Sequence, residues 1–249
     1  MDLLPPDTTL DVRDQDTAVA LLPVGSFEQH GDFLPLVTDT VIACTIAREI
    51  AAAYPVRLLP PVTISCSHEH AAWPGTVSIS AKTLYSVVHD IAASLRLSGV
   101  GHLVLVNGHG GNYVLANVVQ ETVQDAPGTM ALFPSLADMD EARIAAGIST
   151  SLDTDMHAGE LETSVLLHAH PELVKPGYDS ADTVADDRRD LLTLGMAAYT
   201  DSGVIGRPSL ASAQKGKALL AGLVRAFARY PAMFGSSSGS AGRGDGTTP

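Results

Sequence analysis

The chain contains three short segments in which carboxylate and imidazole side chains lie next to glycines. The first is Gly25-Ser26-Phe27-Glu28-Gln29-His30-Gly31, and Asp39 follows it at the start of a predicted helix. Glu28 and His30 are two residues apart, so in extended backbone their side chains point to the same side and can reach one cation. Thr38 as the N-cap would hold Asp39 in the first helical turn. Taken singly, Glu28 and His30 fit a solvated loop better, and Asp39 fits a favourable charge at a helix N-terminus.

The second segment is Asn107-Gly108-His109-Gly110-Gly111-Asn112, which joins a predicted strand to a predicted helix. Glycines in such a loop let the backbone approach a ligand closely, and the helix N-terminus beyond offers free N–H groups. A phosphate-binding loop is the obvious alternative. However, the spacing matches neither the dinucleotide fingerprint nor a P-loop, and no lysine follows. A histidine between glycines instead indicates a metal ligand, His109.

The third segment, Asp155-Met156-His157-Ala158-Gly159-Glu160-Leu161-Glu162-Thr163-Ser164, opens an apolar helix. It again combines carboxylates with an imidazole. By itself it fits an ordinary acidic helix start equally well, because negative charges stabilise the first turn of a helix.

Apolar periodicity predicts the elements that position these segments. Short runs rich in Val and Leu predict buried strands at 18–24, 56–64, 102–106 and 129–133. Helical spacing predicts helices at 39–53, 82–97, 112–124, 161–169 and 210–229. The alternation predicts one α/β domain with a largely parallel sheet and helices on both faces, whose ligand sites lie beyond the carboxyl ends of the strands.

The composition restricts the possible partners. With 15 basic and 28 acidic residues, the net charge of -13 disfavours binding to nucleic acid and to anionic membranes. No apolar run reaches the ~20 residues of a membrane span, and residues 1–16 lack the apolar core of a signal peptide. We therefore expect a cytoplasmic protein. Cys44 and Cys66 lie in apolar stretches and are expected to be buried thiols.

The domain is expected to cover residues 1–234, and the Gly/Ser-rich segment 235–249 is expected to be disordered. This tail contains a serine-hydrolase pattern at 235–239 and Arg243-Gly244-Asp245. The hydrolase pattern needs a preceding strand and a following helix, and neither is predicted here. We therefore assign no function to either motif.

In this order, the three segments resemble the motif set of the creatininase family: Gly-Ser-x-Glu-Gln-His-Gly with Leu-Pro and Asp, then Asn-Gly-His-Gly-Gly-Asn, then His-Ala-Gly-x-x-Glu-Thr-Ser. The stretches Ser67-His68-Glu69-His70, Pro74-Gly75-Thr76 and Gly203-Val204-Ile205-Gly206 also look similar. The resemblance spans roughly Ala18 to Phe227. It implies the creatininase-like fold, hydrolysis of amide bonds, and a homohexamer built as a trimer of dimers.

The resemblance also implies two divalent metal ions. Glu28, Asp39 and His109 would hold one ion, and His30, Asp39 and a glutamate would hold the other, so that Asp39 bridges them. Creatininase itself carries a glutamate in its version of the glycine loop, where this chain has Gly111. The missing carboxylate is expected from Glu162, with Glu160 as the alternative.

Nitrogen and oxygen ligands without thiolate suit Zn²⁺ or Mn²⁺, with Fe²⁺ possible. Two such ions lower the pKa of a shared water, so that hydroxide is available at neutral pH to attack the amide. N–H groups of Gly110, Gly111 and Asn112 would stabilise the oxyanion. His157 would protonate the leaving nitrogen, or alternatively make a structural hydrogen bond.

His70 and Trp73 are expected at the pocket wall or a subunit contact. The remaining histidines, which no motif includes, are expected at the surface or in packing: His68, His89, His102, His168 and His170.

The substrate stays open at this point. An amide, cyclic amide or formamide fits the motifs, and so does a peptide substrate, because the motifs are equally close to a family peptidase that trims the modified mycofactocin precursor. A non-catalytic metal-binding scaffold is the third possibility, but it would have lost a ligand or His157. Divergence at Gly111 argues against creatinine itself.

Overall fold

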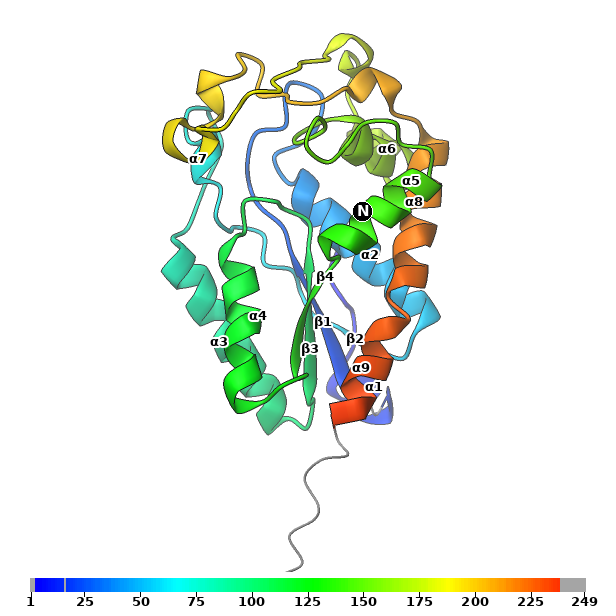
Figure 1. The fold of residues 1–249 in the computed structure, drawn as a ribbon. Coiled ribbons are helices and arrows are strands. Elements are labelled where there is room, and N and C mark those ends of the chain that lie inside the picture. Colours follow the sequence, from blue (N-terminus) through cyan, green and yellow to red (C-terminus); the bar gives the residue numbers. More distant parts are fainter. Residues whose placement is uncertain (1–2, 16, 238–249) are drawn as a thin grey trace, which may run out of the picture.

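The computed structural model describes residues 3–15 and 17–237 (Figure 1). Within them, the strands are β1 (Val19–Val24), β2 (Arg57–Leu58), β3 (His102–Asn107) and β4 (Met130–Phe133). They form one sheet in the order β2-β1-β3-β4, and every neighbouring pair is parallel. The predicted α/β class and parallel sheet are therefore confirmed.

The larger helices lie between and after the strands. They are α2 (Thr38–Ala53), α3 (Ala81–Leu97), α4 (Val114–Asp125), α5 (Leu136–Ala145), α6 (Glu160–Ala169), α8 (Ala213–Ala226) and α9 (Arg229–Ser237). Two short helices, α1 (Thr9–Gln15) and α7 (Leu191–Leu194), and a 3₁₀ turn at His68–His70 complete the elements used below. Within the described residues, no helix combines the length and apolarity needed to cross a membrane.

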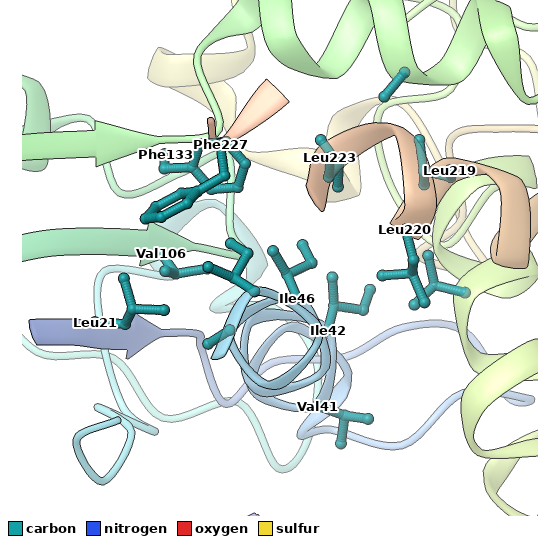
Figure 2. Close-up of a cluster of buried hydrophobic side chains, with 14 of the residues drawn as sticks. Leu21, Val41, Ile42, Ile46, Val106, Phe133, Leu219, Leu220, Leu223 and Phe227 are labelled. Carbon is teal, nitrogen blue, oxygen red and sulfur yellow. The ribbon is translucent and has the colours of Figure 1, made fainter. Parts of the chain in front are cut away.

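Successive residues of each strand face opposite helical layers, as period-two geometry requires. On one face, Leu21 and Phe133 pack against α2 and α8, and Figure 2 shows α2 lying between the sheet and α8. On the other face, Leu22 and Leu105 pack against α3 and α4, which lie together on the left in Figure 1. Helices on both faces explain why the strands are almost entirely apolar.

Two predicted elements are shorter than expected. In the segment 56–64, only Arg57 and Leu58 form a strand, because the prolines at 60 and 61 have no N–H to continue the ladder. The expected helix over 210–229 ends at Ala226, and α9 begins at Arg229. Pro231 accounts for this break, since proline inside a continuous helix removes a hydrogen bond and clashes with the preceding turn.

Helix starts also differ from the sequence expectation. Thr38 was expected as the N-cap of α2, but the N-cap position is Val37, and the Thr38 hydroxyl donates to the carbonyl of Pro35. Asp39 still lies in the first turn, as expected. Helix α4 begins at Val114 rather than at Asn112, because the Asn112 side chain ties neighbouring loops together.

Helical spacing in the sequence does not predict the short helices α1 and α7, nor α5 and the part of α9 after Arg229. Helix α5 begins with a capping box between Ser135 and Asp138, which is a recognisable sequence pattern. Helix α9 continues through Ser237, so residues 235–237 are helical rather than disordered. The rest of the expected tail, including the end of the serine-hydrolase pattern and the Arg-Gly-Asp motif, lies outside the described residues.

The tightest helix contact holds α6 against α8. Gly216 lies so close to α6 that an added Cβ would be 2.0 Å from the Ser164 carbonyl oxygen. We expect Gly216→Ala to lower the free energy of unfolding by about 1–3 kcal/mol, because the helices must separate. At an unconstrained helical site the same change stabilises by up to ~1 kcal/mol, so the sign is diagnostic. Chemical denaturation, with exposed Lys217→Ala in the same helix as the control, measures it.

Candidate metal centre

Asp39 lies at the centre of a buried cluster of carboxylates and imidazoles, beyond the carboxyl ends of β1 and β3. Its Oδ1 is 3.0 Å from His30 Nε2, and its Oδ2 is 3.1 Å from His109 Nδ1. The Ser26 hydroxyl donates to Oδ2 at 2.6 Å. Helix α2 supplies Asp39, and the loops after β1 and β3 supply the two histidines. One carboxylate therefore faces two imidazoles through its two oxygens, as a bridging ligand must.

Glu28 is a completely buried carboxylate in this cluster. Its Oε1 lies 3.1 Å from His70 Nε2 and 3.2 Å from His109 Nδ1. Neither contact has hydrogen-bond geometry, and both carboxylate oxygens lack a hydrogen-bond partner within the part of the chain described here. Because an unsatisfied buried charge is costly, Glu28 fits the role of a cation ligand.

Glu162 completes the cluster from the first turn of α6. Its Oε2 is 3.9 Å from His30 Nε2 and accepts a hydrogen bond from the Ala158 N–H at 2.6 Å. Two sets of potential ligand atoms share Asp39, each with its atoms within 4.8 Å of one another: Glu28, Asp39 and His109, and His30, Asp39 and Glu162. A third set of this kind joins Glu28 and His30 to His157. The structure thus brings together all five residues that the sequence nominated as metal ligands.

Glu160, the alternative to Glu162, does not reach the cluster. Its buried carboxylate accepts hydrogen bonds from the Thr150 hydroxyl at 2.8 Å and from the Lys215 ammonium. Burial would raise the pKa of Glu160, but the hydrogen bonds from Lys215 and Thr150 outweigh it and hold that pKa below its usual value. Glu160 is therefore an ionised structural residue that joins α6 to α8.

Both histidines nearest Asp39 are oriented for cation binding. His30 Nδ1 is 3.1 Å from the Glu28 carbonyl oxygen, and His109 Nε2 is 2.8 Å from the Cys66 carbonyl oxygen. Each ring can therefore donate its far N–H to the backbone and direct its other nitrogen toward Asp39. Metal-binding histidines usually have such a second partner, which fixes the tautomer and the ring orientation.

The cluster needs positive charge. Although burial opposes it, Asp39, Glu162 and Glu28 raise the pKa of His30 to about 9. Burial raises the pKa of Glu162 to about 8. Protons on the imidazoles can balance the carboxylates, and divalent cations can do the same once the ligands are deprotonated. Metal binding is thus expected to release protons.

His157 lies against the cluster, as the sequence predicts. Its Nε2 is 2.6 Å from the Gln29 carbonyl oxygen, which fixes this nitrogen as the N–H donor. Its Nδ1 points toward Glu28, 3.7 Å from Oε1. Burial and the neighbouring His30 and His70 lower the pKa of His157 well below its usual value. His157 is therefore neutral, with the lone pair of Nδ1 directed toward Glu28.

A pocket of about 240 Å³ opens on one side of the cluster, and we call it the polar chamber. Its lining includes six of the residues that the sequence predicts for the site: His70, His109, Gly110, Gly111, His157 and Glu162. The N–H groups of Gly110 and Gly111 donate no hydrogen bond within the described residues, so they can face a substrate. Two expected lining residues, Asn112 and Trp73, are absent from this wall.

Asn112 and Trp73 have other roles. The Asn112 side chain accepts a hydrogen bond from the Cys66 N–H and donates to Asn107 Oδ1. Its backbone N–H donates to the His109 carbonyl. Trp73 lies beside His70, with ring centroids 6.5 Å apart. Asn112 therefore ties loops of the site together, and Trp73 lies outside the lining of the polar chamber.

Sequence reasoning missed Glu69, which lines the polar chamber over Gly111. A Cβ added at Gly111 would lie 2.1 Å from Glu69 Oε1 and 2.5 Å from His109 Nε2. Glu69 therefore occupies the space that a side chain at position 111 would fill. The position of Glu69 between His68 and His70, in a stretch that already resembled the family, was the available sequence clue.

We expect Gly111→Ala to weaken zinc binding by about 10- to 100-fold, the usual effect of disturbing a partner of a metal ligand. The added methyl group must displace Glu69 or His109. Competition with a zinc chelator measures the affinity, and Gly101→Ala, where a Cβ meets nothing within 4 Å, is the matched control. An unchanged affinity in Gly111→Ala would show that the loop relaxes freely.

The remaining histidines and the cysteines have the expected roles. His102 stacks on Phe234, His89 lies tilted against Tyr85, and His170 lies 3.1 Å from the Thr45 hydroxyl. His68 contacts the Ser78 hydroxyl, and His168 is exposed. Cys44 and Cys66 are buried free thiols. None of these histidines belongs to the cluster.

The chain is similar in sequence to proteins of one known family. The family model for creatininase, described as creatinine amidohydrolase, matches residues 7–230. A mycofactocin precursor peptide peptidase of Mycobacterium ulcerans is 36% identical over 217 residues, which cover 82% of this chain and 80% of the relative. Creatinine amidohydrolase of Pseudomonas putida is 26% identical over 224 residues, covering 81% and 84%.

Solved structures show the same fold. A structure titled creatininase Mn has a TM-score of 0.77 at 23% identity, covering 93% of this chain and 97% of its own. A mutant creatininase of Zn-Zn type has a TM-score of 0.76 at 22% identity, covering 95% and 99%. The match of the family model to nearly the whole described chain, together with the peptidase relative above 30% identity, shows that this protein belongs to the creatininase family and is a hydrolase acting on C–N bonds.

Proposed function

We propose that the chain is a dinuclear metal-dependent hydrolase that cleaves an amide bond in a peptide substrate. The observation that carries this proposal is the pair of ligand sets that share Asp39, in which every member except the partly exposed Glu162 is buried. Nitrogen and oxygen donors without thiolate suit Zn²⁺ or Mn²⁺, and Fe²⁺ is compatible. The related creatininase structures named for manganese and zinc support the same choice.

Two divalent cations held here would supply a water of lowered pKa and a charge that polarises the amide carbonyl. Proton transfer and stabilisation of the oxyanion fall to the chain's own residues. His157 would take up at Nδ1 the proton that the attacking water loses and deliver it to the leaving nitrogen, while its Nε2–H stays anchored on the Gln29 carbonyl. Gly110 and Gly111 line the polar chamber, and their N–H groups would donate to the developing oxyanion.

His157 has an alternative role. Its ligand atom also lies within 4.8 Å of those of Glu28 and His30, so it could bind a cation directly. The two roles differ in metal content. A proton-relay residue can be replaced by asparagine without loss of metal, whereas loss of a ligand lowers the number of bound ions.

A peptide is the favoured substrate over creatinine. The mycofactocin precursor peptide peptidases are up to 36% identical to this chain, whereas the creatinine amidohydrolase of Pseudomonas putida is 26% identical. At Gly111 the chain also lacks the loop glutamate of the creatininase motif. The Glu69 carboxylate that fills this space lies in the wall of the polar chamber. The exchange at Gly111 therefore changes the wall of the polar chamber as well as the supply of carboxylate ligands.

The testing experiment compares zinc-loaded, manganese-loaded and chelator-treated protein on a mycofactocin-type precursor peptide and on creatinine. We expect about two ions per chain, cleavage of the peptide into two fragments by mass spectrometry, and loss of cleavage after chelation that added metal restores. Cleavage by fully metal-free protein would contradict the metal mechanism. Hydrolysis of creatinine but not of the peptide would assign the alternative substrate.

A further inference from the structure

A second hollow of about 290 Å³, which we call the apolar chamber, lies next to the polar chamber. The two chambers share His109, Gly110, Met156 and Glu162 in their linings. Two of these shared residues, His109 and Glu162, belong to the two proposed ligand sets. The apolar chamber is thus a second space bordering the same reactive centre.

The side chains around this chamber are mostly apolar. They come from helix α2, from the start of α5 and from the segment before and at the start of α6: Ile42, Ile46, Leu136, Met139, Leu152 and Leu161. Leu136 is 82% exposed, and neither Leu136 nor Leu152 packs in a core cluster. Apolar side chains that surround a hollow beside polar ligands are typical of small-molecule sites.

The polar residues of the wall are already paired within the fold. The Asp155 carboxylate accepts hydrogen bonds from the N–H groups of Glu160 and Leu161, which fixes the start of α6. The Ser135 hydroxyl belongs to the capping box of α5. Apart from the proposed ligand Glu162, the described wall therefore offers no carboxylate or ammonium group left to pair with a charged substituent. Burial of an apolar group is the interaction that this chamber can provide.

We propose that the apolar chamber is a substrate subsite that binds an apolar substituent, up to the size of an aromatic side chain, attached to the scissile amide. This inference rests on the proposed function, because it takes His109 and Glu162 as ligands next to the reacting bond. The chamber volume of about 290 Å³ is enough for one such group. The two chambers together then hold an amide with a polar part on one side and an apolar part on the other.

Two hydroxamic acids, which chelate protein-bound zinc, test the subsite by binding rather than by turnover. Acetohydroxamic acid carries only a methyl group, and 3-phenylpropionohydroxamic acid adds an apolar arm. Calorimetry on zinc-loaded protein gives the dissociation constant of each. We expect the phenyl arm to tighten binding by about 10- to 100-fold, the value of burying an aromatic group.

Substitutions in the wall of the apolar chamber test whether the phenyl arm binds there. In Leu136→Asp and Leu152→Asn, the phenyl arm should tighten binding by less than about 3-fold, because each variant puts a polar group in the wall of the apolar chamber. Asp is also favourable in the first turn of α5. The matched control is Leu97→Asp at the end of α3, a 92% exposed leucine outside both chambers, which should keep the full gain. Circular dichroism confirms that each variant is folded.

Each result has a separate meaning. If acetohydroxamic acid binds native protein but the phenyl arm gains less than 3-fold, the subsite is wrong and the metal centre stands. If the phenyl arm still tightens binding fully in both chamber variants, the arm binds outside the apolar chamber, and the proposed subsite is again wrong. If Leu136→Asp dissociates an oligomer, a second copy covers the chamber and the proposal fails. If acetohydroxamic acid does not bind, the metal centre itself is contradicted, and the subsite falls with it.

Discussion

Asp39→Ala is expected to remove both metal ions of the proposed centre and to lower peptide hydrolysis by on the order of 10³-fold or more, since in that proposal one side chain would serve both ions. The physical reason is that Asp39 faces His30 through Oδ1 and His109 through Oδ2. Its loss leaves each ligand set with two members. Elemental analysis of the purified variant gives the ion count, and single-turnover cleavage of the precursor peptide gives the rate.

Asp32→Ala is the matched control for Asp39→Ala. Asp32 is a carboxylate of the same loop, but its side chain is exposed. It should keep both ions and the native rate. Retention of two ions in Asp39→Ala would show that Asp39 does not bridge them, whatever happens to the rate. A loss of ions in both variants would point to disruption of the loop rather than of a ligand.

Glu162→Gln is expected to keep one ion, lose the other, and reduce hydrolysis by roughly 10- to 100-fold or more. Glu162 contributes to only one ligand set, with His30 and Asp39. The amide keeps the shape of the side chain but loses the charge that a divalent cation requires. Zinc titration followed by elemental analysis distinguishes one bound ion from two. Two ions bound at native affinity would exclude Glu162 as a ligand.

Glu160→Gln provides the comparison, because it changes a glutamate two residues away. It should keep both ions but lower the free energy of unfolding by about 1–3 kcal/mol at pH 7, since the partly exposed Lys215 loses its buried partner. The pKa of Glu160 is depressed in the folded protein. Its stabilising effect is therefore present above the unfolded pKa of ~4.3 and is lost as pH falls through the lower folded value. Chemical denaturation at pH 7 and in acid measures this effect. The difference in unfolding free energy between native protein and Glu160→Gln should be smaller in acid than at pH 7.

The chain's pattern was sufficient to predict the sheet but not every helix. The strands β1 and β3 are buried on both faces, so they form nearly continuous apolar runs that are easily recognised. Helix α5 was missed because it buries little apolar surface, and Asp138 is one of its two buried residues. The break before Arg229 was also missed, because the helical spacing of α8 and α9 continues across it. Pro231 indicates the break because a proline inside a continuous helix would remove a hydrogen bond and clash with the preceding turn.

The sequence by itself was enough to predict that Glu28, His30, Asp39 and His109 lie together. The resemblance to the creatininase motifs nominated them, and they follow strand ends or open a helix that a parallel sheet brings to one edge. The sequence could not choose between Glu160 and Glu162. Two residues along an α-helix are separated by about 200° of rotation, so the two carboxylates point in opposite directions. Only the packing of α6 on α8 decided which of them Lys215 would bind and which would face His30. The position of Glu69 over Gly111 and the apolar chamber likewise depend on contacts between distant segments, which local spacing does not encode.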